Sequence, residues 1–315
     1  MKKTLEDFEI LRTIGTGSFG IVKLAKEKAT DRYFAIKSLS KSSIIQQKQV
    51  DHVMSEFMIL RQIEHPLLVY LDSYFQNDST IRFVTEYVQG GELFTYLRSV
   101  GRLSNDHAKF YAAQVVVMLE YLHSKSIIYR DLKPENLLIG ADGYLKLTDF
   151  GFAKVVVDRT YTICGTPEYI APEILLNKGH GKPVDWWSLG VLIYELLVGI
   201  DPFTAEYPMQ IYENIIRCKV KFPKNIDSQG RRLVRHLLTK DLSKRFGNLK
   251  GGVNDIKFHK WFSGINWQKI IMGEAKAPYV PTIAGPDDCT NFEYIEEVEE
   301  LNVPVDPSVD PFLEW

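Results

Sequence analysis

The sequence lacks the features that would place it in several special classes of protein. It has three cysteines among 315 residues, and Cys164, Cys218 and Cys289 lie too far apart to suggest a disulfide framework or a metal-ligand cluster. No run of eighteen apolar residues is present, so we expect no membrane span. The first residues contain no apolar signal core, and Lys2 stands where an N-myristoyl site needs glycine. These absences favour a reduced, cytoplasmic protein.

A large excess of charge of one sign is also missing. The chain has 38 Lys and Arg residues against 40 Asp and Glu residues, and it has no basic stripe with interleaved aromatic residues, so we expect no nucleic-acid binding. Residues 277–315, however, contain ten acidic residues and no Lys or Arg, which leaves residues 1–276 with a formal charge of +8. This acidic tail also carries aromatic residues that would be costly to expose to water. We therefore expect the tail to lie across the basic body.

The periodicity of the apolar residues changes along the chain. Residues 8–40 alternate as strands do, 45–63 indicate a helix, and 67–87 indicate two further strands. After Gln89-Gly90-Gly91 the pattern becomes helical. The 45% hydrophobic content is sufficient for a large core. We predict an α+β protein with two lobes, a β-rich N-lobe with one main helix and a larger helical C-lobe.

Two helices stand out in the second lobe. Residues 104–123 begin with Ser104 as a plausible N-cap. After it, apolar residues recur every three or four positions, which predicts one buried face of the helix. These residues are Ala108, Tyr111, Ala112, Val115, Met118, Leu119 and Leu122. Residues 185–198 are apolar on all sides, which predicts a helix at the centre of the lobe.

The segment Gly15–Gly20 fits the pattern G-x-G-x-x-G, which alone equally suits an ordinary glycine-rich turn. Because a strand follows it instead of a helix, we interpret it as the tip of a β-hairpin that could approach phosphate oxygens. A Walker A loop is excluded because Ile21 stands in place of its lysine. Lys37, on an apolar strand, needs a partner, and Glu56 on the predicted helix is the candidate. The alternative is a surface lysine.

The segment Tyr129–Asn136 is more specific. It places a potential base, Asp131, close to a cation, Lys133, and an amide ligand, Asn136, and Asp149-Phe150-Gly151 follows thirteen residues later. Asp149 and Asn136 suit Mg²⁺, which prefers oxygen ligands shared with phosphates. Asp131 could orient a hydroxyl nucleophile and accept its proton, while Lys133 could neutralise a transferring phosphoryl group.

Together with Ala171-Pro172-Glu173, these motifs identify a family. The chain resembles eukaryotic protein kinases of the basophilic AGC group and, within it, the catalytic-subunit family of cAMP-dependent protein kinase. The resemblance runs from about Phe8 to Trp315. It implies the bilobal kinase fold, with an N-lobe at 8–88, a C-lobe at 89–262 and a C-terminal tail at 263–315 that wraps both lobes. It also implies transfer of the γ-phosphate of ATP to Ser or Thr, with Mg²⁺ as cofactor.

The resemblance assigns roles to individual residues. The catalytic set is Lys37, Glu56, Asp131, Lys133, Asn136 and Asp149, of which Asn136 and Asp149 hold Mg²⁺. The ATP-binding set comprises Ile14, Gly15, Thr16, Gly17, Ser18, Phe19, Gly20, Val22, Ala35, Lys37, Thr85, Glu86, Val88, Glu92, Leu138, Thr148 and Phe292. Two structural roles are also implied, a pair between Glu173 and Arg245 and a brace of the catalytic loop by Asp185. Thr85 replaces the methionine of relatives, so we expect a wider pocket behind the adenine.

The resemblance places an activating phosphate on Thr162, between Asp149-Phe150-Gly151 and Ala171-Pro172-Glu173. His52, Arg130 and Lys154 match the cations that would bind it. Arg159, three residues before Thr162, suits self-phosphorylation by an Arg-directed kinase. Thr160 is an alternative acceptor, and an unmodified loop is the alternative to both.

Substrate and partner sites are implied by the same resemblance. Carboxylates would bind substrate arginines, and an apolar pocket would hold the residue after the acceptor. The carboxylates are Glu92, Glu135 and Glu195, and the apolar pocket is Ile163, Pro167 and Ile170. For Glu195, which lies in an apolar helix, an internal ion pair is the alternative. Tyr161 and Tyr212 match contacts to a regulatory subunit with cyclic-nucleotide domains and a pseudosubstrate segment.

Other implied partners are peptides like the heat-stable inhibitor and basic protein substrates, and the implied location is the cytoplasm, with the nucleus after release. At the chain end, Phe312 and Trp315 resemble a hydrophobic motif that docks on the N-lobe, with Trp315 in place of phenylalanine. Val303 occupies the position of a tail phosphoserine, so we expect no phosphate there.

Two alternative functions remain beside an active kinase under cAMP control. One is a pseudokinase scaffold, which would require loss of catalytic residues that are present. The other is a relative controlled by cGMP or by no nucleotide.

Overall fold

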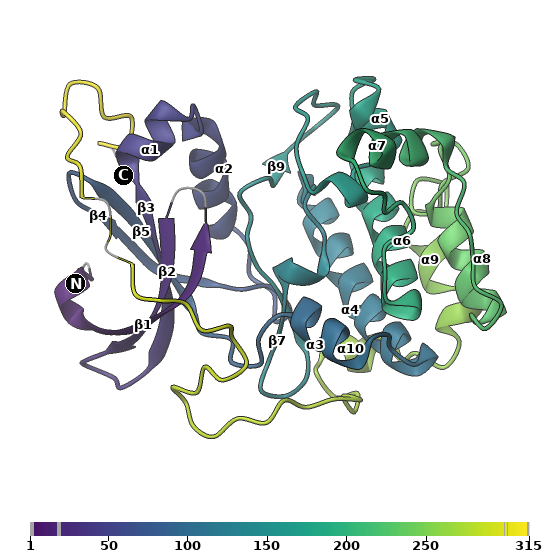
Figure 1. The fold of residues 1–315 in the computed structure, drawn as a ribbon, viewed down its shortest axis with the longest axis horizontal. Coiled ribbons are helices and arrows are strands. Elements are labelled where there is room, and N and C mark those ends of the chain that lie inside the picture. The colour runs from purple at the N-terminus through teal and green to yellow at the C-terminus, as the bar shows by residue number, and fades with distance from the viewer. Residues whose placement is uncertain (1–2, 18–19, 299, 301, 314) are drawn as a thin grey trace.

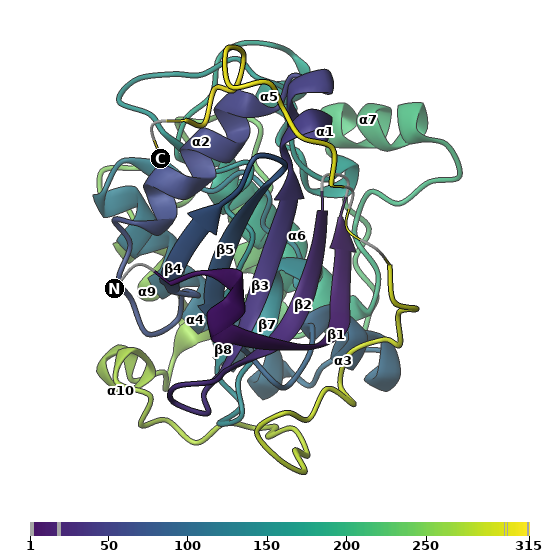
Figure 2. The same cartoon turned by 90° about the vertical axis from the view of Figure 1, so that its left-hand side faces the viewer.

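The computed structural model describes residues 3–17, 20–298, 300, 302–313 and 315, and it has a β-rich lobe beside a helical lobe (Figure 1). The first lobe is built on a five-stranded antiparallel sheet in the order β1-β2-β3-β5-β4 (Figure 2). The strands are β1 (Phe8–Gly17), β2 (Gly20–Glu27), β3 (Tyr33–Ser40), β4 (Leu71–Gln76) and β5 (Thr80–Glu86), and a 3₁₀ turn, η1 (Leu5–Asp7), precedes them. Gly17 pairs with Gly20, so the glycine segment is the end of a β-hairpin, as predicted.

Helices α1 (Lys41–Gln46) and α2 (Val50–Leu60) follow β3. The prediction of one helix over residues 45–63 was wrong, because the chain leaves the helical conformation between the two elements. Lys48 there has a left-handed φ of 56°, which a continuous helix does not allow. In α2, Val53, Phe57 and Leu60 are buried in a core cluster that they share with Phe83 of the sheet. This packing fixes the position of α2 relative to β5.

The second lobe is mainly helical. Its longer helices are α3 (Leu93–Val100), α4 (Asn105–Ser124), α6 (Pro183–Val198), α7 (Pro208–Arg217) and α8 (Ser228–Leu237). Its shorter elements are β6 (Ile127–Ile128), η2 (Pro134–Asn136), β7 (Leu137–Ile139), β8 (Leu145–Leu147), β9 (Lys154–Val155), η3 (Pro167–Tyr169), α5 (Pro172–Leu175), α9 (Asn254–Lys257), η4 (Lys260–Phe262) and α10 (Trp267–Ile271).

The two helices predicted at the core of this lobe are confirmed. The Ser104 hydroxyl caps α4 by accepting a hydrogen bond from the His107 amide, and every residue of the predicted buried face of α4 is buried. Helix α6 packs against α4 and α8 and is buried over nearly its whole length. It ends at Gly199, whose φ of 94° suits glycine.

The C-terminal tail leaves α10 and returns along both lobes to end near α2 (Figures 1 and 2). On the C-lobe, Tyr279 stacks on Tyr96 with ring centroids 3.9 Å apart. On the N-lobe, Glu300 pairs with Arg82 at 2.6 Å. The acidic tail therefore lies across the basic body, as its charge and aromatic residues predicted. In the described part of the chain, no helix has the length and apolar character needed to cross a membrane.

Candidate active site

A cleft with a cavity volume of about 250 Å³ lies between the lobes. Its lining comes from strands of the sheet, from α2, from the hinge after β5, from the chain between η2 and Phe150, and from the tail. Of the predicted ATP-binding residues, it contains Ile14, Gly15, Val22, Ala35, Lys37, Thr85, Glu86, Val88, Glu92, Leu138, Thr148 and Phe292. Thr16, Gly17 and Gly20 are in the hairpin but outside this lining, and Ser18 and Phe19 lie outside the described residues.

The cleft also has walls that the sequence analysis did not assign. They are Leu60, Val69, Phe83, Tyr87 and Phe150. Tyr87 stacks on Phe292 of the tail, with ring centroids 5.9 Å apart, so the tail closes one side of the cleft. Phe150 belongs to the motif Asp149-Phe150-Gly151, but no local motif marks the other four residues. The only signal was their apolar character in strands and helices predicted to be buried.

Lys37, Glu56 and Asp149 form a charged group at the back of the cleft. Lys37 on β3 pairs with Glu56 on α2 at 2.7 Å and lies 3.7 Å from an oxygen of Asp149. Burial opposes the charge of Lys37, but the two carboxylates dominate and raise its pKa. Lys37 in turn holds the pKa of Asp149 below its usual range, so this carboxylate is ionised at neutral pH. The predicted pair of Lys37 and Glu56 is thus present.

Asp131 lies in the catalytic loop before η2, and both of its carboxylate oxygens are held. Oδ1 accepts hydrogen bonds from the amide and hydroxyl of Thr166, at 3.1 and 2.9 Å. Oδ2 accepts from the Asn136 amide at 2.9 Å and lies 3.0 Å from Lys133 Nζ. Lys133 also donates to the Thr166 hydroxyl at 2.9 Å. Sequence analysis did not identify Thr166, which directly precedes η3 as its N-cap residue.

The catalytic loop has a strained backbone that Asp185 supports. Arg130 has a φ of 69°, which non-glycine residues rarely adopt. Fully buried at the start of α6, Asp185 accepts hydrogen bonds from the amides of Tyr129 and Arg130 at 3.0 and 2.9 Å, and it contacts His123 at 2.7 Å. Asp185 therefore holds the loop that carries Asp131. A second predicted structural pair is also present, since Glu173 and Arg245 form two hydrogen bonds, at 2.6 and 2.9 Å.

The residues predicted to bind Mg²⁺ fit a cation shared with phosphates. Asn136 uses its amide nitrogen for Asp131, which leaves its amide oxygen as a ligand. The Asp149 carboxylate is ionised and half exposed to the cleft. Among the described residues, no group of three His, Cys, Asp or Glu side chains could hold a metal alone. A hard cation at this position would need further oxygen ligands, which nucleotide phosphates supply.

The acidic residues predicted to bind substrate arginines differ in their surroundings. Glu92, before α3, is half-buried, and burial together with the nearby charges of Glu135 and Glu293 raises its pKa. Glu195 in α6 is buried, pairs with Arg98 at 2.7 Å and accepts a hydrogen bond from the Tyr169 hydroxyl. The internal partner that was weighed for Glu195 is thus present.

The predicted apolar pocket for the residue after the acceptor is not a single buried surface. Ile163 is 60% exposed, Pro167 is half-buried, and Ile170 is buried. The predicted contacts to a regulatory subunit are accessible, with Tyr161 60% exposed and Tyr212 half-buried on α7.

The activation segment is the chain between Gly151 and Ala171. Thr162, which lies in this segment, is exposed on the surface. Lys154 on β9 donates to the Thr160 hydroxyl at 3.3 Å, and Arg130 donates through Nε to the Phe152 carbonyl at 2.7 Å. His52 on α2 contacts Gln49 and lies edge-on to the Phe152 ring. The pKa of His52 is lowered, first by desolvation and then by the charge of Arg130.

The hydrophobic motif lies against α2. Phe312 is fully buried, and its carbonyl accepts a hydrogen bond from Gln76 at 2.7 Å. Trp315 stacks on Phe57 with ring centroids 4.2 Å apart. Because Phe57 follows Glu56 directly, the end of the tail packs on the helix that carries a residue of the cleft.

Comparisons with known proteins agree with this geometry. Residues 8–262 match the family model of the protein kinase domain. The human "cAMP-dependent protein kinase catalytic subunit PRKX" is 48% identical over 294 residues, which are 93% of this chain and 82% of that protein. The "cAMP-dependent protein kinase type 3" of Saccharomyces cerevisiae is 47% identical over 314 residues, 99% of this chain and 78% of the yeast protein.

The Drosophila melanogaster "cAMP-dependent protein kinase catalytic subunit 3" is 49% identical over 292 residues, and there the chain spans half of the relative's length. Similarity of this extent, together with a two-lobed fold and a cleft built from the kinase motifs, shows the family. The chain belongs to the protein kinases and, among them, to the family of cAMP-dependent protein kinase catalytic subunits.

Proposed function

We propose that this Ser/Thr kinase phosphorylates sites of the form Arg-Arg-x-Ser/Thr-hydrophobic, as the catalytic subunit of a cyclic-nucleotide-regulated holoenzyme. The observation that carries the specificity is a pair of interacting carboxylates, Glu92 and Glu135, which both line the cleft. Neither forms an ion pair with a Lys or Arg among the described residues. Their mutual repulsion would be relieved by a guanidinium, which a carboxylate binds bidentately. Glu195, already paired with Arg98, would share its charge with a second arginine.

The contacts of the cleft support a mechanism of positioning and charge neutralisation. Asp131 would orient the substrate hydroxyl and accept its proton, in place of the hydrogen bond that Thr166 now donates. Lys133 would contact the transferring phosphoryl group, and Lys37, oriented by Glu56, would contact the other phosphates. When bound, Mg²⁺ held by Asn136 and Asp149 would neutralise phosphate charge.

Regulation would act through separate surfaces. A phosphate on Thr162 would be bound by Arg130, Lys154 and His52, and His52 lies one turn before Glu56 on α2. The exposed Tyr161, and Tyr212 on α7, would contact a regulatory subunit whose pseudosubstrate segment occupies the carboxylate sites. This would keep the kinase inactive until the nucleotide releases it.

The proposal is tested by phosphorylation of a serine peptide library with Mg-ATP. We expect strong transfer to Arg-Arg-x-Ser-hydrophobic peptides and none by Asp149→Ala. Glu135→Gln should lower kcat/KM for arginine peptides about ten- to hundredfold, because a charged hydrogen bond is lost. The exposed Glu64→Gln is the matched control. Transfer without arginine preference would refute the specificity, and no transfer by protein phosphorylated at Thr162 would favour a scaffold.

A further inference from the structure

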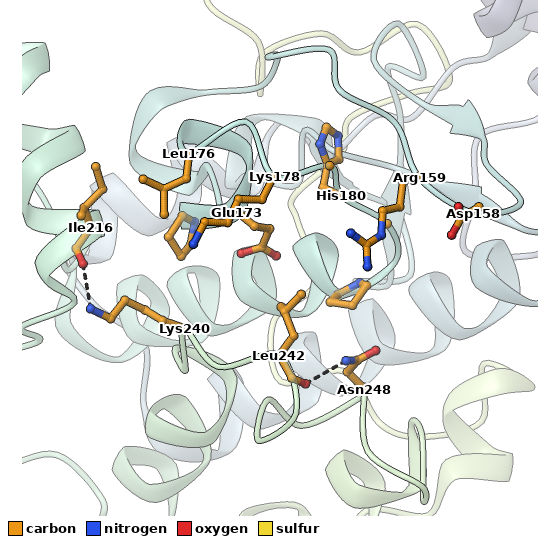
Figure 3. A pocket seen from close by; sticks show the side chains of 14 residues that line it. Asp158, Arg159, Glu173, Leu176, Lys178, His180, Ile216, Lys240, Leu242 and Asn248 are labelled. Atoms are coloured by element: carbon orange, nitrogen blue, oxygen red, sulfur yellow. Dashed lines mark hydrogen bonds between the residues drawn. The ribbon is translucent and has the colours of Figure 1, made fainter.

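A second pocket, with a volume of about 620 Å³, lies beside the activation segment and outside the ATP cleft (Figure 3). Its lining comes from residues 158–159, from α5 and the segment after it, from the end of α7 and from the loop around residues 240–248. His180 is part of this lining, and Figure 3 shows its ring pointing away from the Glu173 carboxylate. His180 and residues 158–159 of the activation segment therefore line the same pocket.

The backbone of His180 is bound to the activation segment. His180 and Thr160 form an isolated antiparallel bridge, with hydrogen bonds of 2.9 and 3.0 Å in the two directions. Residues directly opposite each other in such a bridge project their side chains to the same face. The Thr160 hydroxyl on this face accepts a hydrogen bond from Lys154 at 3.3 Å. The imidazole of His180 and the ammonium group of Lys154 therefore lie on the same side of the activation segment.

Two buried nitrogen atoms in this region have no hydrogen-bond partner among the described residues. They are Nε2 of His180 and Nη1 of Arg130. The two residues are only 3% and 5% exposed, so water cannot readily satisfy them. Buried polar atoms without partners are rare in folded proteins because they cost stability. Together with Lys154 they form a set of nitrogens suited to an anion that has several acceptor oxygens.

The charges that face His180 come from four elements or loops. Burial, Arg130 of the catalytic loop and Lys154 of β9 lower the pKa of His180 to about 4, against the opposing effects of Glu173 on α5 and Asp185 on α6. The imidazole is therefore neutral at pH 7. A phosphate dianion placed beside it would reverse this balance, because a nearby negative charge favours the imidazolium form.

We propose that His180 Nε2 binds the phosphate of Thr162 directly, beside Arg130 and Lys154. This inference rests on the proposed phosphorylation of Thr162. Thr162 is two residues from Thr160 and exposed, so a modifying kinase can reach it. A phosphate has three acceptor oxygens, which matches the three nitrogens. The contact would tie the activation segment to the chain between α5 and α6, a connection that His52 on α2 cannot make.

The inference predicts a pH dependence with a definite sign. Phosphorylation raises the pKa of His180, so the contact between imidazolium and phosphate dianion is complete at a pH above the second pKa of the phosphate and below this raised value. It weakens as the pH rises through that value and the imidazole loses its proton. Conversely, the protonated imidazole lowers the second pKa of the phosphate, which is about 6 for free phosphothreonine.

The test uses the full chain with phosphate at Thr162 verified by mass spectrometry. The second pKa of the phosphate is followed by ³¹P NMR in the wild type, His180→Leu, His180→Gln and the control His107→Leu, which alters a histidine near the start of α4. We expect the apparent pKa to rise by roughly half a unit in His180→Leu and by less in His180→Gln, which keeps a neutral donor. Phosphatase release of the phosphate should become several-fold faster in His180→Leu, and His107→Leu should match the wild type.

Two outcomes overturn the inference in distinguishable ways. Identical ³¹P titrations for all four proteins, with phosphate present on Thr162, would remove His180 from the site and leave the proposed phosphorylation intact. If Thr162 carries no phosphate in the active enzyme, the proposed phosphosite fails and the inference fails with it. Should His180→Leu not fold, the shift in His180→Gln decides the matter.

Discussion

Thr85 illustrates how one side chain controls what a nucleotide cleft accepts. It lies near the end of β5, where its hydroxyl donates to the Ala35 carbonyl at 3.3 Å. Leu60, Val69 and Phe83 line the same cleft. A threonine leaves this apolar region open, whereas a methionine would extend into it. ATP, which should bind along the hinge, needs none of this space.

We therefore predict that Thr85→Met lowers the affinity of inhibitors with a bulky aromatic group behind the adenine by about tenfold or more. A contact worth about 1.4 kcal/mol is lost for each factor of ten. The KM for ATP should change little, and Thr85→Ala serves as the matched control. Titration of both variants with a pair of inhibitors, one bulky and one not, gives the answer. Equal affinities of the bulky inhibitor for wild type and Thr85→Met would show that the region is closed.

Among the elements, α4 shows what local sequence determines. A capping serine and apolar residues spaced by three and four residues predicted its start and its buried face. The division between α1 and α2 was not predictable in this way. It depends on a left-handed conformation at Lys48, a residue type that has no preference for it, and on the packing of α2 against the sheet. Tertiary packing decided that boundary.

Removal of the α4 cap should have a measurable cost. Ser104→Ala leaves the His107 amide without its side-chain acceptor, so we expect a loss of about 1 kcal/mol in the free energy of unfolding. Urea denaturation monitored by circular dichroism measures it. Ser124→Ala, at the other end of the helix, removes only an exposed hydrogen bond to the Tyr121 carbonyl and should cost less. A larger loss in Ser124→Ala than in Ser104→Ala would contradict the capping role.

At the scale of the whole molecule, the tail joins the two lobes around the cleft. Its charge and aromatic content predicted that it binds the body, and family motifs predicted the residues of the cleft. Its individual partners were not predictable, because contacts such as Lys41 with Asp310, at 2.6 Å, join residues 269 positions apart. For the same reason, the contacts of Thr166 with Asp131 and of Tyr87 with Phe292 were not predicted from the sequence. Such contacts are determined by how the lobes and tail fold together, which no local pattern encodes.

The tail should control activity through α2. Phe312 is fully buried, and Trp315 stacks on Phe57, the neighbour of Glu56. Phe312→Ala removes a buried aromatic side chain at a cost of about 3–5 kcal/mol, which should release the end of the tail. We then expect kcat/KM for a peptide substrate to fall about tenfold or more, because Glu56 is less firmly held against Lys37.

Hydrogen exchange distinguishes this effect from general destabilisation. In Phe312→Ala the amides of Val50–Leu60 should exchange faster, while those of α6 should remain protected as in the wild type. Leu313→Ala is the control, since Leu313 is 58% exposed, and it should retain both activity and protection. Phe312→Ala could release the tail and still show normal activity and normal exchange in α2. That result would show that the contact of Trp315 with Phe57 does not position Glu56. The position of α2 would then depend on its own packing against the sheet.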